Sequence, residues 1–106
     1  MSVVLITGCS SGFGLQAALA FARAGDTVYA SMRNVDKAER LRAATTPDLD
    51  IRIVELDVRK PAMFAPLIAS IVSRSRRLDV LVNNAGMIRL GAFEDLEEAE
   101  FRDVIE

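Results

Sequence analysis

Short apolar runs alternate with helical periodicities along the chain. The runs at residues 3–6, 27–31, 51–56 and 80–82 are rich in β-branched side chains, as buried strands are. Between them, residues 13–24 and 64–76 place apolar side chains on one helical face, and residues 36–42 form a shorter and more polar helical segment. This alternation is typical of strand–helix–strand units around a parallel sheet. We therefore predict one α/β domain over residues 1–106, with four parallel strands.

Residues that cap, end or disturb helices set the expected boundaries. Gly25 follows the first helix where a left-handed residue is favoured, and Asp36 is expected to cap the second helix. Pro61 suits a first helical turn, but Pro66 lacks a backbone donor further in, so we expect the start of the third helix to be irregular. After residue 82 we expect a loop, followed by a last helix that a capping box at residues 95–98 opens.

Charge is distributed unevenly along the sequence. The net charge is −2, but residues 1–93 carry twelve Lys and Arg against eight Asp and Glu, a balance of +4. Residues 94–106 carry one against seven, a balance of −6, which we interpret as the exposed face of the last helix. The body of the chain thus suits a small anionic ligand. Its basic residues are scattered and lack interleaved aromatic side chains, which argues against a nucleic-acid partner.

The cysteine content and the lengths of the apolar segments indicate the cellular compartment of the protein. The single Cys9 excludes an internal disulfide, and without a histidine to activate it we expect no catalytic or redox role for its thiol. The first residues lack the charged and apolar regions of an export signal, and no apolar run reaches the length of a membrane span. We expect a cytoplasmic protein with no membrane partner and no metal site.

The most informative motif is the glycine-rich segment between the first strand and the first helix. It reads Thr7-Gly8-Cys9-Ser10-Ser11-Gly12-Phe13-Gly14, with the spacing G-x-x-x-G-x-G. Glycine permits the positive φ angles of a tight turn and lets backbone N–H groups approach a pyrophosphate at a helix N-terminus. Ser10 and Ser11 add hydroxyl donors. The segment therefore predicts a site for a dinucleotide.

Two further motifs follow the third and fourth strands. Leu56-Asp57-Val58 ends the third strand, and Asn83-Asn84-Ala85-Gly86 follows the fourth. Asp57 taken alone could equally be a solvated acid at a strand end. Together with the glycine segment, the spacing of these motifs resembles the short-chain dehydrogenase/reductase family, closest to its hydroxysteroid and retinol dehydrogenase branch. The resemblance covers essentially the whole chain, and Phe13, where the family usually has Ile, departs from it.

The resemblance implies the fold and the roles of the motif residues. It implies a Rossmann-type doubly wound parallel sheet with strand order 3-2-1-4. It also implies that the carboxylate of Asp57 meets the adenine amino group, that Asn83 is structural and that Asn84 faces the ligand. The residues expected to bind the cofactor on this basis are Gly8, Ser10, Ser11, Gly12, Phe13, Gly14, Asp57, Val58, Asn84, Ala85 and Gly86.

The end of the second strand indicates which dinucleotide is bound. An NAD-binding protein of this type presents an acid there to the ribose 2′-hydroxyl, and that acid would repel a 2′-phosphate. This chain has Ser31-Met32-Arg33 instead, and Arg33 can offer a planar fork of donors to the phosphate. We therefore expect NADP(H) rather than NAD(H), with Arg33 as a further cofactor-binding residue. The alternative is a surface arginine without a ligand.

The residues that the resemblance implies for catalysis are not found in this sequence. The family uses a Ser, a Tyr with a Lys four residues later, and an Asn, and the only tyrosine here, Tyr29, is not followed by such a lysine. We expect the catalytic half to be absent, so that the chain binds cofactor without turnover. A hydrophobic alcohol or ketone would be the substrate only with that half present.

A second class of function also fits the sequence. The alternative to a fragment of an oxidoreductase is a free-standing nucleotide-binding or assembly module. Phosphotransfer is disfavoured because the Lys-Ser/Thr pair of a triphosphate-binding loop is missing.

We also expect the fourth strand to be left as an unpaired edge and the chain to self-associate.

Overall fold

The fold is built on one five-stranded sheet. The computed structural model describes residues 1–83 and 86–89, and in that part the strands follow the order β3-β2-β1-β4-β5. The strands are β1 (Val3–Ile6), β2 (Thr27–Met32), β3 (Ile51–Glu55), β4 (Val80–Asn83) and β5 (Gly86–Arg89). The first four run parallel, with β1 between β2 and β4. The predicted parallel order 3-2-1-4 is thus confirmed.

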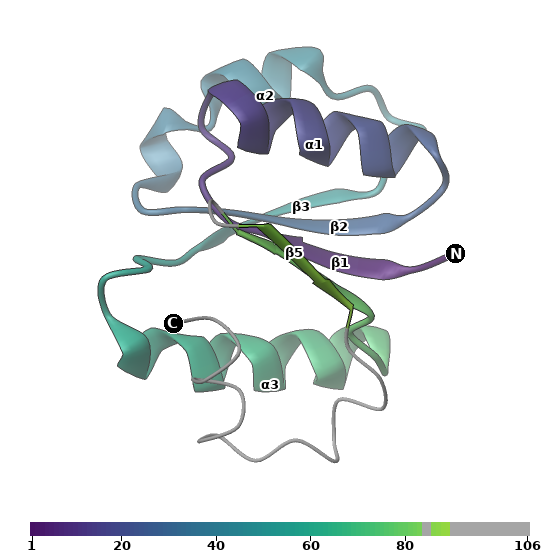
Figure 1. Cartoon of the computed structure of the whole chain (residues 1–106). Helices are drawn as coiled ribbons and strands as arrows, with labels where there is room; N and C mark the ends of the chain where they lie inside the picture. Colours follow the sequence, from purple (N-terminus) through teal and green to yellow (C-terminus); the bar gives the residue numbers. More distant parts are fainter. Residues whose placement is uncertain (84–85, 90–106) are drawn as a thin grey trace.

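Helices cover both faces of the sheet. Helices α1 (Gly12–Arg23) and α2 (Glu39–Ala44) lie on one face, and α3 (Phe64–Ser75) lies on the other, as Figure 1 shows. Each parallel crossover therefore passes over a face of the sheet, which is the arrangement expected of strand–helix–strand units. The observed architecture is the three-layer α/β fold that the alternation of patterns predicts.

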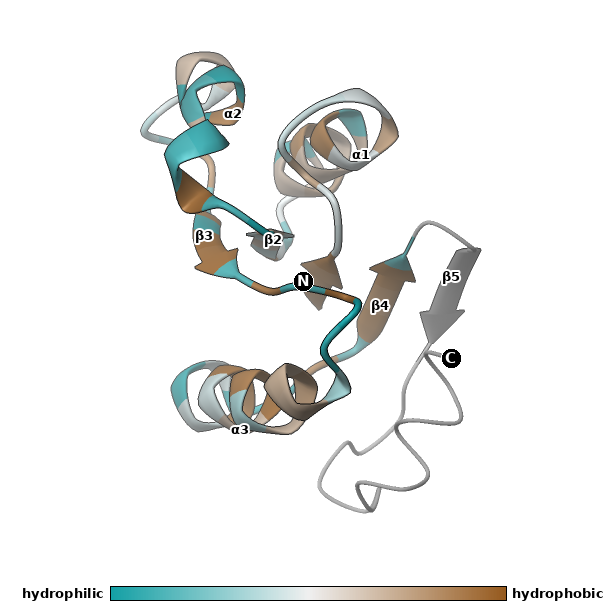
Figure 2. Ribbon diagram, turned by 90° about the vertical axis from the view of Figure 1, so that its left-hand side faces the viewer, coloured by the Kyte–Doolittle hydropathy of each residue, from teal (hydrophilic) through white to brown (hydrophobic). Residues whose placement is uncertain are grey.

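The two faces of the central strands supply two separate cores. Along β1, Val4 and Ile6 pack toward α1, whereas Val3 and Leu5 pack toward α3, because successive side chains of a strand point to opposite faces. The strand therefore has no polar face and is buried at all four positions. Figure 2 shows the brown, apolar colouring of most of β3 and β4. Burial on both faces explains why the apolar runs of β1 and β4 are nearly continuous.

The expectation of an unpaired β4 edge is wrong. Residues 86–89 form β5, which pairs antiparallel with β4, with Val80 opposite Arg89 and Asn83 opposite Gly86. The sequence suggests a loop there because Asn83, Asn84 and Gly86 favour turns, and a strand of four residues is too short to show a period. The last helix expected from residue 95 onward lies outside the described residues.

The segment after β2 also differs from the sequence interpretation. A short 3-10 helix, η1 (Val35–Lys37), precedes α2, so the single helix expected over 36–42 is two elements. The side chain of Asn34 accepts a hydrogen bond from the backbone N–H of Asp36 at 3.0 Å, so Asn34 is the capping residue. The expectation that Asp36 caps this segment is therefore wrong. The two residue types cap equally well, and only the backbone path distinguishes them.

The start of the third helix is irregular, as its two prolines predict. A 3-10 turn, η2 (Pro61–Met63), comes first and α3 begins at Phe64. Pro66 therefore falls in the first turn of α3, where a backbone N–H has no partner within the helix. The helix ends at Arg76, which adopts a left-handed conformation with φ of 69°. No helix in the described part of the chain is both long and apolar enough to span a membrane.

Candidate nucleotide-binding site

The glycine segment lies at the carboxyl edge of the sheet, between the ends of β2 and β4. The N–H of Thr7 donates to the carbonyl of Val82 at 2.9 Å, and the N–H of Cys9 donates to the carbonyl of Ser31, also at 2.9 Å. Gly8, between them, has a φ of +68° that other residues rarely adopt. These contacts hold the segment at the point where successive connections leave for opposite faces of the sheet. Ligands of open α/β sheets bind at such switch points.

Two glycines of the segment are required for different reasons. A Cβ atom on Gly14 would lie 2.1 Å from the carbonyl oxygen of Gly8, so only glycine allows α1 to start this close to the end of β1. Gly12 has a φ of +60°, and a Cβ there would meet nothing within 4 Å. The space beside Gly12 is therefore open, which suits the close approach of a ligand to the backbone.

The N-terminus of α1 faces that open space with its donors available. Ser11 occupies the N-cap position, but its side chain makes no capping hydrogen bond, and the first turn contains no acidic residue. The first N–H groups of a helix carry partial positive charge and bind anions when no side chain occupies them. Ser11 and Phe13 are exposed beside this turn, with Phe13 exposed to 70%. The donor set therefore fits the pyrophosphate of a dinucleotide.

Two other polar side chains of the segment, those of Cys9 and Thr7, are buried beneath it. Burial raises the pKa of the Cys9 thiol to about 12, against a smaller lowering by a hydrogen bond with the Ser31 backbone. The thiol donates to the carbonyl of Ile6 at 3.2 Å. The hydroxyl of Thr7 is buried without a hydrogen-bond partner among the described residues. Cys9 thus has the properties of an inert core residue rather than a nucleophile.

A pocket of about 250 Å³ adjoins the glycine segment at the end of β2. It is lined by Ser10, Met32, Arg33, Asn34 and Lys37. The side chain of Arg33 is exposed there, and so is that of Lys37, which the η1 turn places on the same pocket. Two cations and a hydroxyl group therefore line one hollow, and none of its lining residues is acidic. Such a lining can bind a phosphate group.

Asp57 lies at the same edge of the sheet, two residues after the end of β3. The N–H of the preceding Leu56 donates to the carbonyl of Met32 at 3.0 Å, which places Asp57 next to the end of β2. The Asp57 side chain is only 7% exposed. Hydrogen bonds from the side chain and backbone of Arg59 hold the pKa of its carboxyl group well below the usual range, against the effect of burial. Asp57 is thus an ionised acceptor, and Val58 beside it is half-exposed.

The structure brings most of the expected site residues to one edge. The glycine segment, Arg33 and the Asp57-Val58 pair come together there, at the ends of three adjacent strands. Asn84 and Ala85 lie outside the described residues, so their expected positions are not described. Gly86 is described only as the first residue of β5.

Two residues of this edge were missed by sequence reasoning. Lys37 follows Arg33 by four residues, but Arg33 lies before η1, so no helical spacing in the sequence indicates that both line one pocket. Arg59 was not considered because an i, i+2 pair of opposite charges in a loop does not predict contact. Only the path of the chain after β3 brings its guanidinium group onto Asp57.

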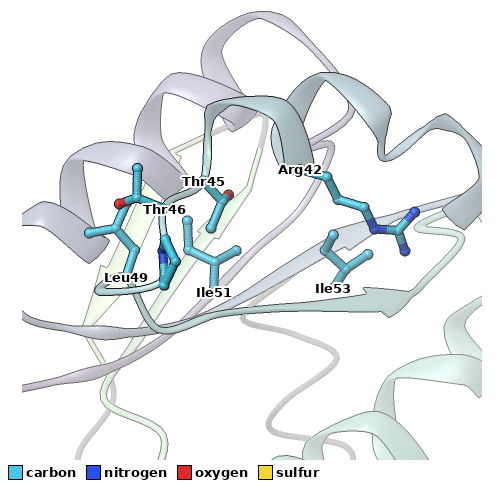
Figure 3. A pocket seen from close by; sticks show the side chains of 7 residues that line it. Arg42, Thr45, Thr46, Leu49, Ile51 and Ile53 are labelled. Carbon is cyan, nitrogen blue, oxygen red and sulfur yellow. The ribbon is translucent and has the colours of Figure 1, made fainter.

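A larger pocket lies away from the glycine segment, beside α2 and β3. It has a volume of about 550 Å³ and is enclosed by the edge strand β3, the end of α2 and the loop that joins them, as Figure 3 shows. None of its lining residues belongs to the glycine segment or follows the end of a strand, and its only charged side chain is Arg42. In residues 1–83 no cluster of side chains could hold a metal ion.

Comparisons with known proteins agree with this geometry. The family model for short chain dehydrogenase matches residues 2–106. The chain is 38% identical to human retinol dehydrogenase 8, covering 97% of this chain and 34% of that protein. It is 36% identical to 11-beta-hydroxysteroid dehydrogenase 1A of Arabidopsis thaliana, covering 91% of this chain and 28% of that protein. The chain therefore spans about a third of the length of these relatives.

Solved structures show the same fold. A short-chain dehydrogenase from Streptomyces avermitilis has a TM-score of 0.68 at 41% identity, covering 96% of this chain and 37% of that one. An NADPH-dependent reductase involved in bacilysin biosynthesis has a TM-score of 0.71 at 29% identity, covering 86% and 38%. A 3-ketoacyl-(acyl-carrier-protein) reductase from Brucella melitensis, complexed with NADH, has a TM-score of 0.64 at 31% identity, covering 76% and 32%. With its fold, its glycine segment and a family match over nearly all residues, this chain belongs to the short-chain dehydrogenase family.

Proposed function

We propose that the chain is the dinucleotide-binding part of an oxidoreductase and that it prefers NADP(H) to NAD(H). When bound, the nicotinamide ring supplies or accepts the hydride that such an enzyme exchanges with a carbonyl or alcohol substrate. The residues of this chain would hold the dinucleotide. The glycine segment and the α1 N-terminus would bind the pyrophosphate, Asp57 and Val58 the adenine, and Asn84, Ala85 and Gly86 the ribose on the nicotinamide side.

The preference for a 2′-phosphate rests on the pocket at the end of β2. Arg33 and Lys37 provide two cations there, and Ser10 provides a hydroxyl donor from the glycine segment. A carboxylate that could accept hydrogen bonds from a ribose 2′-hydroxyl is not among the lining residues. Charge-assisted hydrogen bonds from two cations to one phosphate are the strongest contacts that this edge can offer. This pocket is the single observation that carries the proposed preference.

We propose that this chain binds the cofactor but does not catalyse hydride transfer by itself, because its only tyrosine is buried in the core. Tyr29 is 1% exposed on the α3 side of β2. Its hydroxyl group lies 2.6 Å from the Ser75 hydroxyl group and accepts a hydrogen bond from Arg52 at 2.9 Å. A general acid for a carbonyl substrate must reach the substrate. We therefore expect the chain by itself to bind cofactor without turnover.

Calorimetric titration with NADPH and NADH tests the proposal. We expect the wild-type chain to bind NADPH about tenfold to a hundredfold more tightly than NADH, as contacts to a charged phosphate imply. Arg33→Ala should remove most of this difference and Lys37→Ala part of it. Both variants should leave the affinity for NADH nearly unchanged, because the pocket contacts only the 2′-phosphate.

Arg40→Ala is the matched control. Arg40 is an exposed cation on α2 that does not line the pocket, so its loss should change the ratio of the two affinities little. Equal wild-type affinities for NADPH and NADH would contradict the NADP preference. The absence of binding to either nucleotide would contradict the proposed function itself.

A further inference from the structure

The ion pair at the end of β3 differs from the two other ion pairs of residues 1–83. Asp50 also accepts a hydrogen bond from the Thr27 hydroxyl group, and Asp79 also accepts one from the N–H of Val3. Each of those carboxylates therefore ties two strands or their entering loops together. Within the described part of the chain, the hydrogen bonds found for the carboxylate of Asp57 instead come from Arg59, two residues further along the same loop. The Asp57–Arg59 pair thus joins no two elements of the fold.

The geometry of this pair holds the carboxylate in one orientation. Oδ1 of Asp57 accepts from the backbone N–H and from Nε of Arg59, both at 3.0 Å, and Oδ2 accepts from a terminal guanidinium nitrogen at 2.9 Å. A planar guanidinium group that binds both oxygens of a carboxylate fixes its plane as well as its position. A carboxylate has about four acceptor positions, so one position on Oδ2 remains after these three bonds.

The exposed fractions of the two side chains indicate that Arg59 holds the Asp57 carboxylate in place, and not the reverse. The Asp57 side chain is 7% exposed, whereas the Arg59 side chain is 68% exposed. Solvent screens the arginine end of this pair, and the arginine loses side-chain entropy, so the pair adds little to stability beyond the ionised state of its carboxylate. The pair does, however, keep the nearly buried Asp57 ionised, since it lowers the pKa of its carboxyl group. An ionised carboxylate can only accept hydrogen bonds, and an amino group is its natural donor.

We propose that Arg59 is a positioning residue, which orients the Asp57 carboxylate so that its remaining acceptor position receives the exocyclic amino group of adenine. This inference rests on the proposed function, since it assumes that a dinucleotide binds at this edge. Arg59 would act before the ligand arrives, because a carboxylate that is already fixed loses no further rotational freedom on binding. Through Asp57, Arg59 would therefore favour adenine over other bases, whereas Arg33 and Lys37 would favour a nucleotide with a 2′-phosphate.

The test compares two nucleotides that differ only at the base. In the hypoxanthine analogue of NADPH, a carbonyl oxygen replaces the 6-amino group of adenine and would face the carboxylate as a second acceptor. Calorimetric titration of the wild-type chain should show about tenfold or more tighter binding of the adenine form, the size expected for a hydrogen bond to a charged group. Arg59→Met keeps the apolar stem of the side chain and removes its donors, and it should reduce this ratio to within about threefold.

Two further variants separate orientation from charge. Arg59→Lys keeps the positive charge but lacks the planar fork, so we expect an intermediate ratio of adenine to hypoxanthine affinity. Lys60→Ala removes an exposed cation next to the pair without removing a hydrogen bond to the carboxylate, and it should leave the ratio unchanged.

The outcomes distinguish this inference from the proposed function. A wild-type chain that discriminates between the bases, with Arg59→Met discriminating equally well, overturns the role of Arg59 and leaves the proposed function intact. A higher ratio in Arg59→Met would show that Arg59 competes with adenine for Asp57, and it also overturns the inference. Equal wild-type affinity for both bases removes Asp57 as an adenine ligand. The absence of binding to any dinucleotide overturns both the inference and the proposed function.

Discussion

At the scale of single residues, Gly14 cannot accept a side chain unless the backbone around it moves. A Cβ atom there would lie 2.1 Å from the Gly8 carbonyl oxygen, and neither backbone segment can move without disturbing the contacts of β1. We predict that Gly14→Ala lowers the free energy of unfolding by about 3 kcal/mol or more, at the upper end of what overpacking costs. It should also weaken the binding of NADPH and NADH alike. Urea denaturation and calorimetry measure the two effects.

Gly12→Ala is the control for that prediction. A Cβ at Gly12 meets no atom within 4 Å, so the cost comes only from its φ of +60° and should be about 1–2 kcal/mol. A loss of stability in Gly14→Ala no larger than in Gly12→Ala would show that α1 can move away from the end of β1.

At the scale of elements, a hydrogen bond joins β2 and α3 across the core that lies between the sheet and α3. The hydroxyl group of Tyr29 lies 2.6 Å from that of Ser75, in the last turn of α3. We predict that Ser75→Ala lowers the free energy of unfolding by about 1 kcal/mol, the usual net value of such a bond, and that Tyr29→Phe lowers it further, because it also removes the hydrogen bond from Arg52. The double variant should lose less than the sum, because each change removes the same bond. Urea denaturation of the cycle measures the coupling.

Ser73→Ala serves as the matched control in the same helix. Ser73 is exposed, so this change should leave the stability within about 0.5 kcal/mol of wild type. Strictly additive effects of Tyr29→Phe and Ser75→Ala would show that the two hydroxyl groups do not interact.

At the scale of the whole molecule, two aspartates in ion pairs, Asp57 and Asp79, make stability depend on pH. The Arg59 hydrogen bonds lower the pKa of Asp57; for Asp79, burial acts to raise the pKa but hydrogen bonds from Arg77 and Val3 outweigh it. A carboxyl group with a lowered pKa stabilises the folded state above its unfolded pKa of about 4, and this contribution is lost as the pH falls through the folded value. We therefore predict a urea midpoint that is constant from pH 7 to 5 and falls below about pH 4.

The absence of histidine makes this prediction specific. The sequence contains none, so no side chain with an ordinary pKa near 6.5 changes charge between pH 7 and 5. A midpoint that already falls within that range, or one that is unchanged down to pH 3, would contradict the assignment. Measurements at constant ionic strength keep the effect of charge screening out of the comparison.

Self-association also belongs to the scale of the molecule and stays a prediction. Its original basis, an unpaired β4, does not hold because β5 pairs with that strand. In the part of the chain that the structure describes, the other outer strand, β3, pairs only with β2, and unpaired edges invite association. Sedimentation velocity should show a mass that rises with concentration in the micromolar range. A constant monomer mass over that range would contradict it.

The sequence by itself determined the parallel sheet, because short apolar runs that alternate with helical periodicities are typical of strand–helix–strand units around such a sheet. It also determined where the glycine segment lies, since Gly8, Gly12 and Gly14 stand between a strand and a helix. These features depend on neighbours close in the chain, whose spacing is visible in the sequence.

Only the tertiary structure decided the features that depend on the path of the backbone between elements. It placed Arg59 on Asp57 and Lys37 beside Arg33, and it made Asn34 the cap in place of Asp36. It also turned residues 86–89 back along β4 as an antiparallel strand. Residue type and spacing leave each of these choices open, because several side chains of one segment could make the same hydrogen bond. The angle at which the chain leaves each strand selects the one that reaches its partner.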